Sequence, residues 1–162
     1  MSIDSSKIRA LHFLSALIFL FLSSCSSVQA PWQLDEIVSH NPAYQSKRLL
    51  HIASNKNTGF DLEIGHILSE HHVHINVFSR QIPAYLGDLK KALITISNEK
   101  ESRNMLVHRL EGGQRIFLGK DETQFLLASL ETYKEVNIYL EGYEENIDTK
   151  DFTTLFSKFP SD

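Results

Sequence analysis

Apolar side chains take every second position between residues 60 and 65, and the same alternation recurs between residues 73 and 78. A period of two is typical of a strand with one buried and one exposed face. The five residues 68–72 between the two stretches have a suitable length for a hairpin loop. The pattern therefore predicts an antiparallel β-hairpin in the first half of the chain.

Other apolar stretches extend this β-rich pattern along the chain. The sequence Glu111-Gly112-Gly113 predicts a second hairpin turn, because glycine accepts a positive φ. Further strands are predicted at residues 44–53, 92–97, 105–110, 114–118 and 136–140. The run 141–145, with three glutamates, is predicted to be a solvated loop, and contact with a basic partner is its alternative role.

Apolar residues at helical spacing predict two helices before residue 140. The first would cover residues 85–93 after Pro83, although Gly87 weakens the pattern. The second would follow a capping box formed by Asp121 and Gln124, with an apolar stripe behind it.

A last helix is predicted near the C-terminus, capped by Asp148 or Thr149. Its apolar face contains Phe152, Phe156 and Phe159, which we expect to lie in the core. A partner-binding stripe is the alternative role of these rings. A run of strands followed by helix, strand and helix predicts an α+β fold, namely an antiparallel sheet or small β-sandwich with two C-terminal helices packed on it.

Composition limits the classes of function. The chain has 162 residues, of which 42% are hydrophobic and 22% charged, enough for one packed domain. A formal net charge of -4 argues against non-specific binding of nucleic acid, which requires a basic surface. We find no Gly-x-Ser-x-Gly elbow, phosphate loop, dinucleotide fingerprint or His-Glu-x-x-His motif. These observations favour a protein without enzymatic activity.

Residues 1–24 have the pattern of a secretory signal peptide. Lys7 and Arg9 form a positive head, followed by the apolar run 11–22. Twelve residues make a helix of about 18 Å, too short to cross a bilayer comfortably. A buried helix of the fold is the alternative.

The apolar run ends in Leu22-Ser23-Ser24-Cys25, which contains the only cysteine of the chain. This segment resembles the lipobox of bacterial lipoproteins, in which a leucine and two small residues precede an invariant cysteine. A competing cleavage site after Ala30 is followed by Pro31, whose ring suits extended-chain cleavage poorly. A free buried cysteine is the alternative role of Cys25.

The resemblance implies cleavage before Cys25, a diacylglycerol thioether on its sulfur and an acyl chain on its amino group. Two or three acyl chains anchor a protein firmly to a membrane. Because Ser26 rather than aspartate follows the cysteine, the resemblance favours the outer membrane, facing the periplasm. Residues 25–31 would then be a lipidated tether and residues 32–162 a single α+β domain. We expect Trp32 to pack on this domain, with the lipid headgroups as its alternative contact.

Four of the eight histidines fall within residues 66–74, the one concentration of metal-ligand residues. If the apolar faces of the first hairpin align, Glu63 lies opposite His74, with His72 on the same face. Two imidazoles and a carboxylate suit zinc or copper. We expect plain surface residues here and keep metal binding as the alternative. His66 shares its strand face with apolar residues and is expected at the edge of the core.

The sequence therefore predicts a lipid-anchored envelope protein, without enzymatic activity and without a bound cofactor, that binds another envelope protein. The alternative is a periplasmic metal-binding protein that uses His72, His74 and Glu63.

Overall fold

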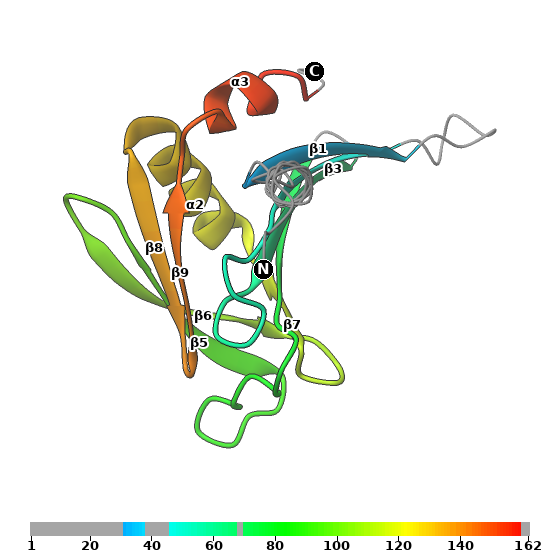
Figure 1. The fold of residues 1–162 in the computed structure, drawn as a ribbon. Coiled ribbons are helices and arrows are strands. Elements are labelled where there is room, and N and C mark those ends of the chain that lie inside the picture. Colours follow the sequence, from blue (N-terminus) through cyan, green and yellow to red (C-terminus); the bar gives the residue numbers. More distant parts are fainter. Residues whose placement is uncertain (1–30, 38–45, 68–69, 160–162) are drawn as a thin grey trace, which may run out of the picture.

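A computed structural model describes residues 31–37, 46–67 and 70–159. Nine strands form one sheet in which all neighbouring strands are antiparallel, in the order β1-β2-β3-β4-β7-β6-β5-β8-β9 (Figure 1). The strands are β1 (Trp32–Ile37), β2 (Ser46–His51), β3 (Asp61–Ile67), β4 (Glu70–Asn76), β5 (Lys91–Ser97), β6 (Ser102–Arg109), β7 (Arg115–Leu118), β8 (Glu135–Leu140) and β9 (Tyr143–Asp148). The predicted antiparallel sheet is confirmed, and the described strands belong to one continuous sheet rather than the two sheets of a sandwich.

The alternating pattern determines the register of the first hairpin. In the β3–β4 pair, Leu62 lies opposite Ile75 and Glu63 lies opposite His74, as the aligned apolar faces predict. Leu62 and Ile75 are fully buried. The strand β4 begins at Glu70, so the connection is shorter than predicted.

The sheet curls until its first and last strands meet. The indole Nε1 of Trp32 in β1 donates a hydrogen bond of 2.8 Å to the backbone carbonyl of Asp148 in β9. Farther along β9, the amide of Glu144 donates to the carbonyl of Thr58, in the β2–β3 loop, at 2.9 Å. Trp32 is therefore buried against the fold, as predicted, with 3% of its surface exposed.

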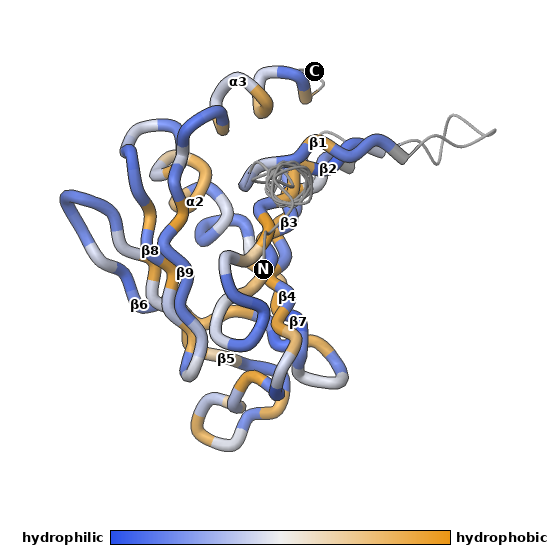
Figure 2. The backbone as a smooth tube through the Cα atoms, in the orientation of Figure 1, coloured by the Kyte–Doolittle hydropathy of each residue, from blue (hydrophilic) through white to orange (hydrophobic). Residues whose placement is uncertain are grey.

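Two short helices complete the described fold: α2 (Lys120–Thr132) and α3 (Phe152–Phe156). The helix α2 lies between the two arms of the curled sheet, and apolar segments of the chain face this interior (Figures 1 and 2). The helix α3 packs on β1 and α2. Phe152 and Phe159 are buried and Phe156 is partly buried against the core, so the predicted core role of these rings is confirmed.

Both predicted helix caps are wrong. The helix α2 starts one residue before Asp121, and its N-cap is Gly119, which has no side chain to offer. The helix α3 is capped by Asp151, without a side-chain hydrogen bond. Thr149 instead donates its hydroxyl to the carbonyl of Tyr133, at 2.6 Å. Asp121 lies inside the first turn of α2 rather than before it.

The acidic run is also different from its prediction. The strand β9 begins at Tyr143, within the segment predicted to be a loop, and Tyr143 and Glu145 are buried. A charged residue at an inward-facing position hides the period-two pattern of this strand. The edge strand β1 was likewise not predicted, because Asp35 and Glu36 interrupt its apolar pattern.

The helix predicted at residues 85–93 does not form. Leu86 and Gly87 have φ angles of 46° and 83°, which a right-handed helix does not accommodate. The segment makes a tight turn instead, with the amide of Asp88 donating to the carbonyl of Tyr85, and β5 starts at Lys91.

Candidate functional site

The structure brings the three predicted metal ligands to one face of the β3–β4 hairpin. Glu63 and His74 are direct partners in the register, and His72 lies two residues before His74 on the same strand face. The inward-facing residues of both strands are apolar and buried, which turns these three side chains outward. Cys25, the predicted lipidation site, lies outside the described residues.

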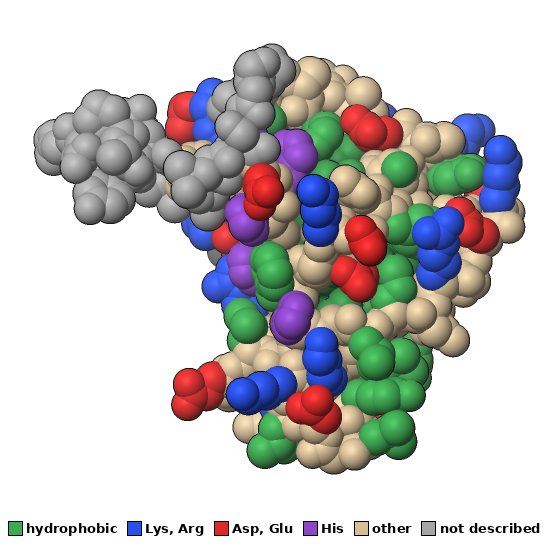
Figure 3. Space-filling view, turned by 180° about the vertical axis from the view of Figure 1, so that it is seen from behind, with side chains coloured by type: hydrophobic (Ala, Val, Ile, Leu, Met, Phe, Trp, Pro, Cys, Tyr) green, Lys and Arg blue, Asp and Glu red, His purple; other side chains and the backbone are tan. Residues whose placement is uncertain are grey.

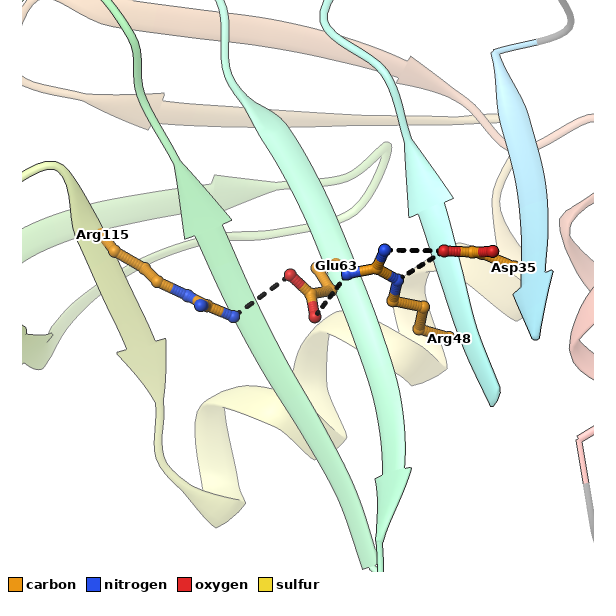
Figure 4. A network of polar contacts seen from close by, with 4 residues as sticks. All are labelled: Asp35, Arg48, Glu63 and Arg115. Carbon is orange, nitrogen blue, oxygen red and sulfur yellow. Dashed lines mark hydrogen bonds and ion pairs between the residues drawn. The ribbon is translucent and has the colours of Figure 1, made fainter. Parts of the chain in front are cut away.

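The carboxylate of Glu63 is already held by two arginines (Figure 4). Arg115 of β7 donates to Oε2 at 3.1 Å, and Arg48 of β2 lies 3.8 Å from Oε1. Arg48 also donates to Asp35 of β1, at 2.6 and 2.8 Å. Charges of alternating sign therefore form a row across the sheet, and a metal ion at Glu63 would have to compete with two guanidinium groups.

Three imidazoles surround one phenyl ring on this face. The ring centroids of His72, His74 and His108 lie 5.9, 5.2 and 6.1 Å from that of Phe117. Figure 3 shows histidine side chains gathered on this side of the molecule. Among the described residues, no group of three or more histidine, cysteine, aspartate or glutamate side chains has an arrangement that could hold a metal ion.

Burial lowers the pKa of His74, and the nearby Arg115 lowers it further. Glu63 opposes both effects but does not cancel them. Burial and Arg115 both favour the neutral imidazole, because the charged form loses hydration and meets a neighbouring positive charge. His74 is therefore a neutral side chain packed on Phe117 at neutral pH.

The other two histidines of the cluster face inward. The rings of His66 and His71 lie 5.2 Å apart, opposite each other in the register. They contact the aromatic rings of the C-terminal segment: His71 lies 5.0 Å from Phe156, and His66 lies 6.4 Å from Phe159. His66 thus lies at the edge of the core, as its strand face predicts.

A second polar cluster, not foreseen from the sequence, lies where β2 approaches β9. His51 and Glu145 have only 3% and 2% of their surfaces exposed. Glu145 accepts a hydrogen bond from the amide of Ser54 at 3.0 Å, and the ring of His51 lies edge-on to Trp32. Burial lowers the pKa of His51, while Glu145 and two aspartates partly offset that effect. Because both side chains are buried, this cluster offers no open surface to a substrate.

An exposed apolar surface lies on the other arm of the sheet. It consists of five side chains on the outward faces of β5, β6 and β8 and on the loop before β5: Leu86, Leu89, Leu93, Leu106 and Tyr139. Leu86 and Leu89 are 88% and 71% exposed. Leu93 and Leu106 are partners in the register, so they lie side by side. We call these five residues the apolar surface.

A groove of about 450 Å³ crosses part of the apolar surface. Leu93, Thr95 and Tyr139 line it from the sheet, and the loop before β5 supplies the facing wall. Its lining residues are Ile82, Pro83, Ala84, Tyr85, Leu86, Leu93, Thr95, Tyr139 and Glu141. The sequence pattern missed this groove because it placed Leu86, Leu89 and Leu93 on the face of a helix.

No protein-family model matches the chain, and comparisons with curated proteins and with solved structures likewise give no match. Within the part of the chain that the structure describes, no helix has the length and apolarity needed to cross a membrane.

Proposed function

We propose that this chain is a lipid-anchored protein of the bacterial cell envelope that binds another envelope protein and has no enzymatic activity. The observation that carries the proposal is the apolar surface. Isolated exposed apolar residues are common on protein surfaces, but a contiguous group is typical of an interaction site. Here Leu86, Leu93 and Tyr139 line one groove, Leu106 is the register partner of Leu93, and Leu86 is 88% exposed.

The chemistry-bearing residues favour binding over catalysis. Glu63 is paired with arginines, and His74 packs on Phe117. The pKa of His51 is lowered, but the residue is buried within the fold. A catalytic acid or base must reach a substrate, whereas these groups are used in packing and ion pairs.

The lipid anchor at Cys25 remains part of the proposal, with the lipobox as its support. Six residues separate Cys25 from Trp32, which span at most about 20 Å when extended. The domain would therefore lie close to the membrane, with the outer membrane favoured by Ser26.

The position of the groove fits such an anchored protein. Trp32, near the start of the described chain, contacts Asp148 at one end of β9. The amide of Arg80, two residues before the groove, donates to the hydroxyl of Tyr143 at the other end of β9. A six-residue strand separates its ends by about 17 Å. The loop before β5 and the strand β1 thus lie at opposite ends of the molecule (Figure 1), and an anchored domain would present the groove away from the membrane.

The test is quantitative co-purification of the intact lipoprotein from detergent-solubilised membranes after cross-linking in cells. The test variant is Leu93→Ser/Tyr139→Ser, and the matched control is Phe78→Ser. Phe78 is 44% exposed, similar to Leu93 at 42%, but does not line the groove. We expect one or more envelope proteins to be lost with the test variant and retained with the control. Identical recovery with all three forms would contradict the proposal.

Metal binding by His72, His74 and Glu63 is the second proposal. One observation favours it, namely the register that places Glu63 opposite His74. Because Arg115 already pairs with Glu63, we rank metal binding below the proposed binding of an envelope protein. We call the protein in that first proposed role the interaction module.

A further inference from the structure

The groove combines an apolar floor with one charge. Leu93 and Tyr139 supply apolar surface from neighbouring strands, and Leu86 stands above them on the facing wall. Glu141 follows β8 directly and is the one charged residue among those that line the groove. An exposed carboxylate next to apolar surface favours a ligand that pairs an apolar side chain with a positive charge.

The surroundings of the groove on β8 and β9 strengthen this negative potential. Glu144 is exposed on β9 and lies opposite Tyr139 of the groove in the β8–β9 register. Asn137 donates to Glu144 at 2.9 Å, which orients that carboxylate without neutralising it. Among the ion pairs of the described residues, none involves Glu144 or Glu141.

Lys91 and Arg80 lie near the groove, Arg80 on the side of Glu141 because its guanidinium is bound to the next residue, Gly142. Lys91, the first residue of β5, lies opposite His108 in the β5–β6 register, beyond Leu93. The guanidinium of Arg80 is bound to the carbonyl of Gly142 at 3.0 Å. Neither side chain lines the groove, so its own charge is negative.

We infer that the groove binds a segment of a partner protein in which a large apolar side chain stands next to a lysine or arginine, and that Glu141 determines this specificity. The inference rests on the proposed function, whose partner it describes. The apolar side chain would contact Leu93, Tyr139 and Leu86, and the basic group would pair with Glu141. A bilayer surface fits less well, because anionic headgroups are repelled by the carboxylates of Glu141 and Glu144.

The experiment selects random twelve-residue peptides, displayed on phage, against the full-length lipoprotein in detergent. Binders that are also retained by Leu93→Ser/Tyr139→Ser are removed. We expect the remaining peptides to place an apolar residue beside lysine or arginine. For such a peptide, Glu141→Gln should weaken binding two- to fivefold and Glu141→Lys about tenfold. Phe78→Ser and Glu111→Gln, neither of which alters a groove residue, should leave it unchanged.

Several results would overturn the inference. One such result is a selection that yields no groove-dependent peptide, and another is a set of peptides whose affinity is the same for wild type and both Glu141 variants. If the Cys25→Ala protein binds vesicles of phosphatidylethanolamine and phosphatidylglycerol, and a substitution of Leu86 abolishes that binding, the occupant of the groove is a membrane. If the protein self-associates in sedimentation and Leu93→Ser/Tyr139→Ser abolishes that association, the occupant of the groove is a second copy of the chain.

The two proposals fail in different ways. If Leu93→Ser/Tyr139→Ser loses the envelope partner but Glu141→Lys retains it fully, the interaction module stands and the basic specificity is wrong. If neither variant changes co-purification, the interaction module itself is wrong.

Discussion

The indole of Trp32 and the backbone carbonyl of Asp148 join the first strand of the sheet to the last, across 116 residues of sequence. The ring also packs 4.9 Å from Phe152 of α3 and 5.0 Å from His51 of β2. One side chain therefore connects both edges of the sheet with the C-terminal helix, and we call this contact the seam.

Substitution of Trp32 tests the contribution of the seam to stability. Trp32→Phe keeps an aromatic ring but removes the N–H donor, which should lower the free energy of unfolding by about 1 kcal/mol, and by more if the carbonyl is left buried without a partner. Trp32→Ala also removes the packing and should cost about 3–5 kcal/mol. Urea unfolding followed by circular dichroism measures both. An alanine variant as stable as the wild type would show that the seam does not hold the fold together.

The pH dependence of stability should report on His51. Its pKa is lowered in the folded protein, mainly by burial, so the unfolded chain binds more protons below the ordinary pKa of about 6.5. Stability is therefore complete above that pH and decreases as the pH falls through it toward the folded pKa. The titration of one group changes the free energy of unfolding by at most about 1.4 kcal/mol per pH unit.

His51→Gln provides the comparison, with urea unfolding at pH 7.5, 6.5 and 5.5. The difference in stability between wild type and variant should shift in favour of the variant as the pH falls. His74→Gln should do the same more weakly, because His74 is only partly buried. A pH-independent difference for His51→Gln would contradict the lowered pKa.

Titration with zinc and copper tests the metal proposal. We expect binding weaker than about micromolar, because a metal ion at Glu63 competes with Arg115, and we expect it to weaken further below about pH 6.5 as imidazoles are protonated. The comparison uses untagged protein and the variants His72→Ala/His74→Ala and Glu63→Ala. Sub-micromolar binding that both variants reduce would instead place metal binding ahead of the interaction module.

The lipid anchor has a direct test in cells. Cys25→Ala should accumulate as an unprocessed precursor that incorporates no labelled palmitate, because the thioether requires the sulfur. Ser26→Asp should keep the lipid but shift the protein toward the inner membrane in a host with that sorting rule. A wild-type protein without lipid would contradict the lipobox, and unchanged fractionation of Ser26→Asp would remove the support for the outer membrane.

Local patterns were sufficient to predict those elements whose partners lie close in sequence. The β3–β4 register follows from alternation alone, because a one-residue slip would turn Leu62 and Ile75 outward. The helix α2 follows from its buried apolar face. The segment 85–93 has apolar residues at helical spacing, but the turn at Leu86 and Gly87 prevents the helix and leaves Leu86 and Leu89 exposed.

The candidate site could be predicted only in part for a similar reason. The position of Glu63 opposite His74 depends on a local hairpin, and the sequence contains it. The hydrogen bond from Arg115 to Glu63 spans 52 residues and depends on β7 lying next to β4. A single sequence carries no local signal for such a contact. The buried Glu145 was missed because composition places glutamate in solvent.

The long sequence separation across the seam has a consequence for the order of folding. Hairpins such as β3–β4 and β8–β9 close short loops, whereas Trp32 and Asp148 can meet only after most of the sheet has formed. We therefore expect the seam to form late and, in the native protein, to open before the central strands do. Hydrogen exchange would show this as faster exchange of the β1 amides than of the β5 amides. A chain that crosses a membrane unfolded would then have one last step to complete in its destination, namely to bring its two ends together.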